Sequence, residues 1–223
     1  MWRLKKRFSF PVPIQTFVVF VGICLAWTFT WILKEHLDAN FSVLANPSGS
    51  FIFWTAAKLI LWILPAFWLV RVSGRTLGET FNLSEWRRWL ARGAGAGIVV
   101  ALTGLIPKYM DGKPLLPHEF SFPLLTILTV APVFEEFLLR GAVLPSLMKG
   151  FSFLQANILS SAMFLFLHVP GWFFMGNLGE NLTRPFGGAC SIFLLGLIFG
   201  YVAHRGRSVL GSMLAHFFNN LAS

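Results

Sequence analysis

Seven apolar runs constrain this chain of 223 residues more than any other feature of its sequence. A helix that crosses a bilayer needs about 20 mainly apolar residues, because the hydrocarbon core is about 30 Å thick. The runs cover residues 13–33, 51–70, 93–106, 122–147, 153–174, 186–204 and 209–223. The pattern therefore predicts an all-α fold, a polytopic transmembrane helix bundle of about seven spans, with six or eight as the alternatives.

The composition excludes several other classes of protein. Hydrophobic residues make up 56% of the chain and charged residues only 12%, whereas a soluble domain carries about 25% charged residues. An ordinary soluble enzyme, a disordered chain and a disulfide scaffold are thereby excluded. The two cysteines, Cys24 and Cys190, lie in apolar runs without metal-type spacing, and we interpret them as buried free thiols.

The positive charge of the chain is best explained by membrane topology. The net charge of +9 comes from 18 Lys and Arg residues against 9 Asp and Glu residues, and cytoplasmic loops of membrane proteins collect Lys and Arg. With a cytoplasmic N-terminus, twelve of the 18 lie inside, four outside and two within spans. The inside set is Arg3, Lys5, Lys6, Arg7, Arg71, Arg75, Arg87, Arg88, Arg92, Lys149, Arg205 and Arg207; the outside set is Lys34, Lys108, Lys113 and Arg184.

This bias predicts a cytoplasmic N-terminus and an external C-terminus. It also removes the need for a nucleic-acid partner, because the basic residues have a topological role. We expect an integral, multi-pass protein whose surroundings are the lipid bilayer, and we expect that bilayer to be a bacterial cell membrane. Residues 1–120 would form an N-terminal part with three spans, and residues 121–223 a four-helix membrane core.

Two short segments of the N-terminal part have residue patterns that predict a particular local structure or contact. Residues 83–90 place Leu and Trp at helical spacing with Arg87 and Arg88 on the other side, which favours a short interfacial helix; a plain basic loop is the alternative. The run from Gly93 to Gly97 alternates glycine and alanine. Such small residues favour close contact between helices over contact with lipid.

Ionisable residues are rare within the predicted spans. At membrane depth such groups are costly, and they commonly mark functional sites. Lys58 stands alone in the second span, where snorkelling or pairing with another helix would explain it, and we assign it no catalytic role. The full set is Lys58, Glu135, Glu136, Arg140, His168 and His216.

The fourth span carries two adjacent glutamates with different neighbours. Glu136 and Arg140 are four residues apart, so they share one helix face and can form an ion pair. Glu135 points about 100° away around the helix. One glutamate is therefore expected to be tied to Arg140 while Glu135 stays available for chemistry. The alternative is a buried charge cluster that only fixes helix packing.

The remaining polar groups fall at similar depths on two further spans. Counted from the turn near residues 149–152, Glu135 and His168 lie roughly 21 and 24 Å up two antiparallel helices, so their side chains could meet. Counted from Arg207, His216 and Asn220 lie roughly 14 and 20 Å deep on one face of the last span. Asn219 points elsewhere. Taken singly, each could be a packing residue or an interhelical hydrogen bond, but their depths are compatible with one cavity.

Together these groups are suited to amide hydrolysis. A carboxylate beside a neutral imidazole can take a proton from water, and a second histidine with an asparagine amide can donate to the resulting oxyanion. The alternative is that Glu135, His168 and His216 bind zinc, which would then activate the water. The HExxH spacing of familiar zinc peptidases is absent.

Three ordered motifs carry a family resemblance: Glu-Glu-x-x-x-Arg at 135–140, Phe-x-x-x-His at 164–168 and His-x-x-x-Asn at 216–220. This set resembles the CPBP family, which comprises the type 2 CAAX prenyl proteases and the Abi proteins of bacteriocin processing or self-immunity. The resemblance covers about residues 124–222, while residues 1–120 carry no family motif.

The resemblance implies an intramembrane endopeptidase that acts on a membrane-associated protein or peptide, CAAX-like, lipidated or leader-bearing. It implies Glu135 as the general base and His168 as a group that holds the water. Glu136 and Arg140 would organise the site, and His216 with Asn220 would stabilise the oxyanion. The sequence assigns no substrate-binding residue. The alternative function is a non-catalytic membrane immunity or assembly factor that keeps the protease fold, and a proton or ion transporter is the third.

Overall fold

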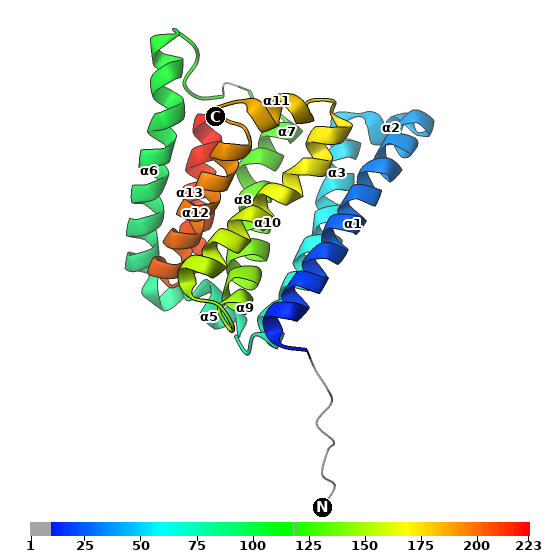
Figure 1. Ribbon diagram of the computed structural model, residues 1–223. Coiled ribbons are helices and arrows are strands. Elements are labelled where there is room, and N and C mark those ends of the chain that lie inside the picture. Colours follow the sequence, from blue (N-terminus) through cyan, green and yellow to red (C-terminus); the bar gives the residue numbers. More distant parts are fainter. Residues whose placement is uncertain (1–9, 118) are drawn as a thin grey trace, which may run out of the picture.

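The computed structural model describes residues 10–117 and 119–223, and throughout these residues the regular structure is helical (Figure 1). The predicted all-α bundle is therefore confirmed. The basic residues Arg3, Lys5, Lys6 and Arg7, which contribute to the expected topology, lie outside the described residues. The orientation of the bundle across the membrane stays a prediction.

Six helical units among the described residues are long and apolar enough to cross a membrane. The seventh expected span is the helix α13, Val209–Ala222, which has only 14 residues. At about 1.5 Å per residue it is about 21 Å long, which is less than the thickness of the hydrocarbon core. The six units are Val12–Asn40, Pro47–Val72, Leu77–Met110, Phe122–Leu147, Phe153–Phe174 and Ala189–Gly206.

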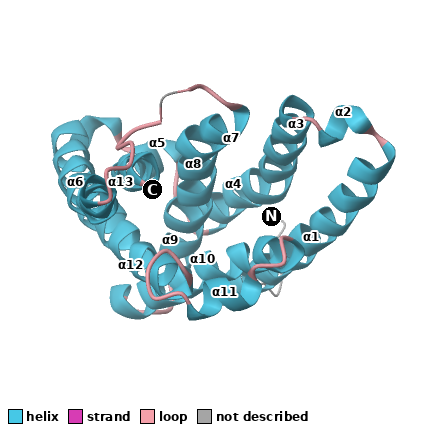
Figure 2. Cartoon of the chain, turned by 90° about the horizontal axis from the view of Figure 1, so that it is seen from above, coloured by secondary structure: helices cyan, strands magenta, loops and turns pink. Residues whose placement is uncertain are grey.

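The units are arranged with α8 (Ala131–Glu136) and α10 (Phe153–Phe174) at the centre (Figures 1 and 2). On one side lie α1 (Val12–Asn40), α3 (Pro47–Lys58) and α4 (Leu64–Val72). On the other side lie α6 (Trp86–Met110), α12 (Ala189–Gly206) and α13. Short helices α2 (Ser42–Ala45) and α11 (Leu178–Thr183) lie in the connections.

Two of the spanning units contain π-helical stretches that precede prolines. In the second unit the stretch is Leu59–Ile63. In the fourth unit, Thr126–Val130 lies between α7 (Phe122–Leu125) and α8, and Phe137–Val143 lies between α8 and α9 (Leu144–Leu147). Proline lacks an N–H and clashes with the carbonyl of the preceding turn, so a widened turn accommodates it. The prolines are Pro65, Pro132 and Pro145, each the second residue after its stretch.

The segment before the third span differs from both sequence-based expectations. Residues 83–85 form a short 3₁₀ turn, and residues from Trp86 onward already belong to α6, so there is neither a separate interfacial helix nor a plain loop. The helix α6 continues from Leu90 through Gly93 without a break, and Gly93 packs against α13. A helix that the sequence reasoning missed, α5 (Leu77–Phe81), is started by a capping box between Thr76 and Glu79.

The glycines of α6 bring α13 close, as their small size predicts. A Cβ atom at Gly93 would lie 2.5 Å from the carbonyl oxygen of Gly211, and one at Gly97 would lie 2.7 Å from the ring of Phe218. Gly95 has open space around its Cα. Gly93 and Gly97, which are one turn apart on α6, therefore allow the close approach of α13, the helix that carries His216.

A cluster of indole rings holds α1 against the second unit. The ring centroids of Trp27 and Trp62 are 4.8 Å apart, and those of Trp31 and Trp54 are 4.4 Å apart. Aromatic pairs of this kind each contribute about 0.5–1.5 kcal/mol beyond their buried area. The cluster fixes the position of the second unit next to α8.

The cysteines differ from the expected buried thiols in one respect. Both are free, and Cys24 is half-buried, but Cys190 is exposed. Cys190 is the second residue of α12, where the helix emerges from an exposed loop.

Candidate active site

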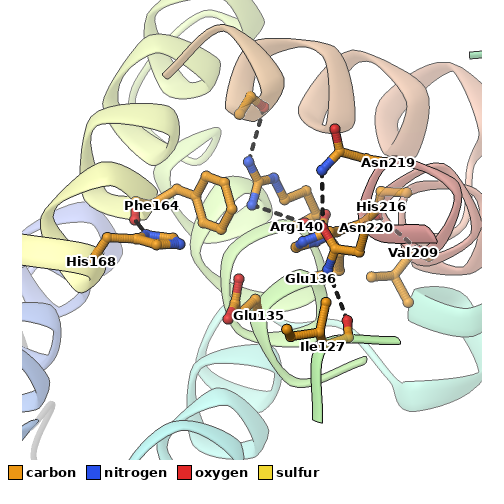
Figure 3. A network of polar contacts seen from close by, with 12 residues as sticks. Ile127, Glu135, Glu136, Arg140, Phe164, His168, Val209, His216, Asn219 and Asn220 are labelled. Atoms are coloured by element: carbon orange, nitrogen blue, oxygen red, sulfur yellow. Dashed lines mark hydrogen bonds and ion pairs between the residues drawn. The ribbon is translucent and has the colours of Figure 1, made fainter. Parts of the chain in front are cut away.

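The two adjacent glutamates end α8, where the helix passes into the π-helical stretch that carries Arg140. The exposed fractions are 7% for Glu135, 0% for Glu136 and 2% for Arg140. Charges buried to this extent require partners, since removing an ion from water costs several kcal/mol. Figure 3 shows that the partners come from different helices.

Glu136 is the shared acceptor of a buried charge cluster. Its Oε1 accepts hydrogen bonds from Nη1 of Arg140 at 3.2 Å and from Nδ1 of His216 at 3.0 Å (Figure 3). Arg140 also donates from Nη2 to the carbonyl oxygen of Gly196 at 2.9 Å, and its guanidinium lies 4.5 Å from the ring centroid of Phe164. The expected Glu136–Arg140 pair is therefore present, and it ties α8 to α10, α12 and α13.

Glu135 has a cationic neighbour that the sequence reasoning did not assign to it. The Nζ atom of Lys58 lies 3.5 Å from Oε1 of Glu135, and the same ammonium lies 4.7 Å from the ring centroid of Trp62. Of the two explanations for Lys58, pairing with another helix is the correct one. Glu135 therefore has a charged partner, and this partner comes from a span far away in the sequence.

The orientation of the His168 ring follows from its hydrogen bond. Nδ1 of His168 lies 2.8 Å from the carbonyl oxygen of Phe164 (Figure 3). A carbonyl oxygen only accepts, so Nδ1 carries the hydrogen and Nε2 of the neutral ring is left as an acceptor. The Phe164 ring meets His168 edge-on at 4.9 Å and His216 edge-on at 6.0 Å between centroids, so one aromatic ring positions both histidines.

The asparagines at the end of α13 bond to the fourth unit and to each other. Nδ2 of Asn220 donates to the carbonyl oxygen of Ile127 at 2.8 Å, and Nδ2 of Asn219 donates to Oδ1 of Asn220 at 2.9 Å. Helix periodicity places Asn219 away from the other groups. In the structure its side-chain amide nevertheless contacts Asn220. It orients the Asn220 amide, which keeps a second N–H for another acceptor.

The polar groups of the three motifs gather in one region. Figure 3 shows the side chains of Glu135, His168 and His216 around one region, and Lys58 contacts Glu135 from the second unit. The expectation from helix depth that Glu135 and His168 lie near each other is consistent with this arrangement. Oε2 of Glu136 and Nε of Arg140 are buried without a hydrogen-bond partner in the part of the chain that the structure describes.

The three ligands that the sequence suggests for zinc do not fit a metal ion in this arrangement. Within residues 10–117 and 119–223, no group of three His, Cys, Asp or Glu side chains is placed to hold one. The ammonium of Lys58 is next to the Glu135 carboxylate. A second cation at this carboxylate would be repelled by the first, so we derive no step through a metal.

Residues 117–222 match the protein-family model described as type II CAAX prenyl endopeptidase Rce1-like. All three motifs fall within the matched range, whereas Lys58 lies outside it. No curated protein and no solved structure matches the chain.

Proposed function

Over residues 117–222 the chain belongs to the Rce1-like family of type II CAAX prenyl endopeptidases, and from this premise we propose that it is an intramembrane endopeptidase in which Glu135 and His168 activate water. Its apolar helices make it an integral membrane protein, and its family is one of CAAX-type proteases. The observation that carries the proposal is a buried carboxylate, Glu135, in the same region as an imidazole whose Nε2 is an acceptor (Figure 3).

The first step is proton transfer from water. Nε2 of His168 accepts a hydrogen bond from the water and holds its oxygen towards the substrate carbonyl. Glu135 takes the other proton while the water oxygen forms a bond to the carbonyl carbon. The C=O π electrons move to the carbonyl oxygen, which becomes the oxyanion. Lys58 holds the Glu135 carboxylate in place through the 3.5 Å contact.

The second step breaks the peptide bond. The oxyanion is stabilised by the second N–H of the Asn220 amide, in the region where α13 meets the fourth unit. His216 adds a second donor through Nε2 when both of its ring nitrogens carry hydrogen, since its Nδ1–H is bonded to Glu136. The C–N bond then breaks, and the proton on Glu135 passes to the departing nitrogen. Glu136 and Arg140 touch no reacting atom; they position His216 and join α8 to α12.

The proposed substrate is a membrane-associated protein with a CAAX-type prenylated C-terminus. The family description supports this class, and a site built from buried side chains of apolar spanning helices suits a substrate that is already in the bilayer. A lipidated protein of another kind, or one that carries a leader segment, is the alternative substrate.

Cleavage by the purified full chain tests the proposal. The protein is reconstituted in liposomes with a farnesylated peptide that carries a fluorophore and a quencher on either side of the expected bond. Wild type should cleave it, and Glu135→Gln should reduce the rate by about 10²–10⁴-fold, the usual range for loss of a general base. Glu180→Gln, at an exposed glutamate of α11 that pairs with Arg184, is the matched control and should keep the wild-type rate.

Equal rates for wild type and Glu135→Gln would contradict the mechanism. That outcome would favour the non-catalytic membrane factor, whose phenotype depends on the fold and not on the Glu135 carboxylate.

A further inference from the structure

A strongly basic cavity of about 750 Å³ lies at the end of the bundle where α5, α9 and the turn between α12 and α13 meet (Figure 1). Arg140 of the candidate active site also lines it, and Glu79 is its one lining carboxylate among the described residues. The other cationic lining residues are Arg75, Arg88, Arg92, Lys149, Arg205 and Arg207.

Few of these cations are neutralised within the protein. Arg88 and Arg207 share Glu85, at 3.2 and 3.8 Å. Apart from Arg140, the four remaining cationic residues that line the cavity form no ion pair with a carboxylate in the described part of the chain: Arg75, Arg92, Lys149 and Arg205. Cations held this close repel one another. An anion bound among them would be attracted to each of them and would offset that repulsion.

The walls of the cavity are fixed by hydrogen bonds between distant segments. Nδ2 of Asn82 donates to the carbonyl oxygen of Arg207 at 3.0 Å, and the hydroxyl of Ser208 donates to the carbonyl oxygen of Phe81. Ser208 also accepts from the backbone N–H of Leu210 and so caps α13. The cavity is therefore formed before any ligand arrives, which lowers the entropic cost of binding.

An apolar groove of about 440 Å³ between α6 and α12 adjoins the cavity. The two hollows share Arg92 and Arg205. The rest of the groove is small or apolar: Ala91, Gly95, Ala96, Leu197, Ile198 and Val202, with Tyr201 beside Arg205. A ligand that reaches both hollows must combine a hydrocarbon chain with an anionic group.

We propose that the cavity and groove bind one anionic phospholipid, with its phosphate between Arg92 and Arg205 and an acyl chain along the groove. Arginines recognise phosphate oxygens through paired, charge-assisted hydrogen bonds, and basic pockets between spanning helices suit anionic headgroups. The tendency of Lys and Arg to collect in loops on one side of a membrane does not account for an apolar groove that ends at two of these arginines. The inference is independent of the proposed protease activity.

The bound lipid would also lie next to the active site. Arg140 is 2% exposed, lines the cavity, and has an Nε atom without a partner in the described residues. Its other two nitrogens are bonded to Glu136 and to the Gly196 carbonyl. An anionic headgroup would therefore bring negative charge into the cavity that Arg140 also lines.

Native mass spectrometry of the full chain, purified in detergent, tests the site. Dioleoylphosphatidylglycerol and dioleoylphosphatidylcholine have the same acyl chains and are added in separate titrations. We expect tighter binding of phosphatidylglycerol, and a roughly fivefold loss of its affinity in each of Arg92→Gln and Arg205→Gln. Arg87→Gln is the control, because Arg87 is exposed at the same end of the bundle but lies outside the cavity.

A second pair of variants tests the groove. A side chain at Gly95 extends into open space, so Gly95→Leu should fill the groove without disturbing the fold and should weaken binding of phosphatidylglycerol. Gly22→Leu is the matched control, because Gly22 on α1 also has no atom within 4 Å of a Cβ. Unchanged thermal unfolding in detergent would show that all these variants are folded.

Three outcomes would overturn the proposal. Equal affinity for the two lipids would show that no anionic headgroup is recognised. Unchanged binding in Arg92→Gln and Arg205→Gln would place the lipid elsewhere. Binding of inorganic phosphate with the same dependence on both arginines, together with no effect of Gly95→Leu, would assign the cavity to a soluble phosphate.

Discussion

Lys58 Nζ lies 3.5 Å from Oε1 of Glu135, and this contact joins the second spanning unit to the helix that carries the paired glutamates. Both side chains are about nine-tenths buried. Removing one partner of a buried pair leaves an uncompensated charge, whereas removing both leaves two neutral groups. The contact therefore couples the N-terminal part of the chain to the family domain.

Lys58→Met should destabilise the protein by about 3 kcal/mol, because the Glu135 carboxylate stays buried without its partner. Denaturant unfolding in detergent measures the change. The double variant Lys58→Met with Glu135→Gln should recover most of the lost stability, since neither group is then charged. A double variant as unstable as Lys58→Met alone would show that packing of the lysine stem, and not the ion pair, is what matters.

The adjacent glutamates should respond differently to the same substitution. Glu136→Gln removes the acceptor shared by Arg140 and His216 at a position that is fully buried. We expect a loss of about 3–5 kcal/mol in unfolding free energy, together with loss of activity. Glu135→Gln should lose activity with a smaller loss of stability, because it leaves only the Lys58 ammonium without its carboxylate, and that ammonium keeps its contact with the Trp62 ring. Thermal unfolding and peptide cleavage measured on the same preparations separate the two, and equal stability of the two variants would contradict the assignment.

His168→Asn tests the role of Nε2. An asparagine amide N–H takes the place of Nδ1 and can still donate to the Phe164 carbonyl, but it leaves nothing where Nε2 was. The expected result is a fall in kcat of about 10²–10⁴-fold with nearly unchanged unfolding. A variant that kept the wild-type kcat would show that the ring only packs against Phe164.

The local part of the site could be predicted from the sequence because it depends on helix periodicity. Glu136 and Arg140 are one turn apart, so their pairing follows from the geometry of a single helix. The same holds for the boundaries of the fourth and fifth units, where Lys149 to Ser152 form a sharp turn before the capping box of Ser152 and Gln155.

The rest of the site depends on how separate helices pack. The Lys58–Glu135 contact needs the register of the second unit against the fourth, which single-helix spacing does not contain. Asn219 was placed elsewhere by a regular helix wheel, but a flexible amide reaches its neighbour Asn220. The π-helical stretch Phe137–Val143 also shifts the faces of the fourth unit, and its signal in the sequence is Pro145, the second residue after the stretch.

Chelation should leave the activity unchanged. The ammonium of Lys58 is next to Glu135, so a zinc ion at this carboxylate would meet a cation already in place, and no group of three His, Cys, Asp or Glu side chains in the described residues is placed to hold a metal ion. Peptide cleavage is measured before and after treatment with 1,10-phenanthroline and removal of the chelator, and the zinc content of the purified protein is measured in parallel. Loss of cleavage that added zinc restores would contradict this expectation and would require a rearranged site.

Two glycines of α6 provide the last test, because Gly93 packs against α13 and Gly95 does not. A methyl group at Gly93 would lie 2.5 Å from a backbone oxygen of Gly211, and backbone cannot move aside as a flexible side chain can. Gly93→Ala should therefore cost about 1–3 kcal/mol of unfolding free energy and lower the cleavage rate, because α13 carries His216.

Gly95→Ala adds the same methyl group two residues along the same helix, where nothing lies within 4 Å. It gains helix propensity and should keep or slightly raise the stability, by up to about 1 kcal/mol. Unfolding and cleavage measured side by side make the comparison direct. If both variants behaved alike, helix propensity alone would explain them. A loss confined to Gly93→Ala would show that the active site depends on the close approach of α13 to α6.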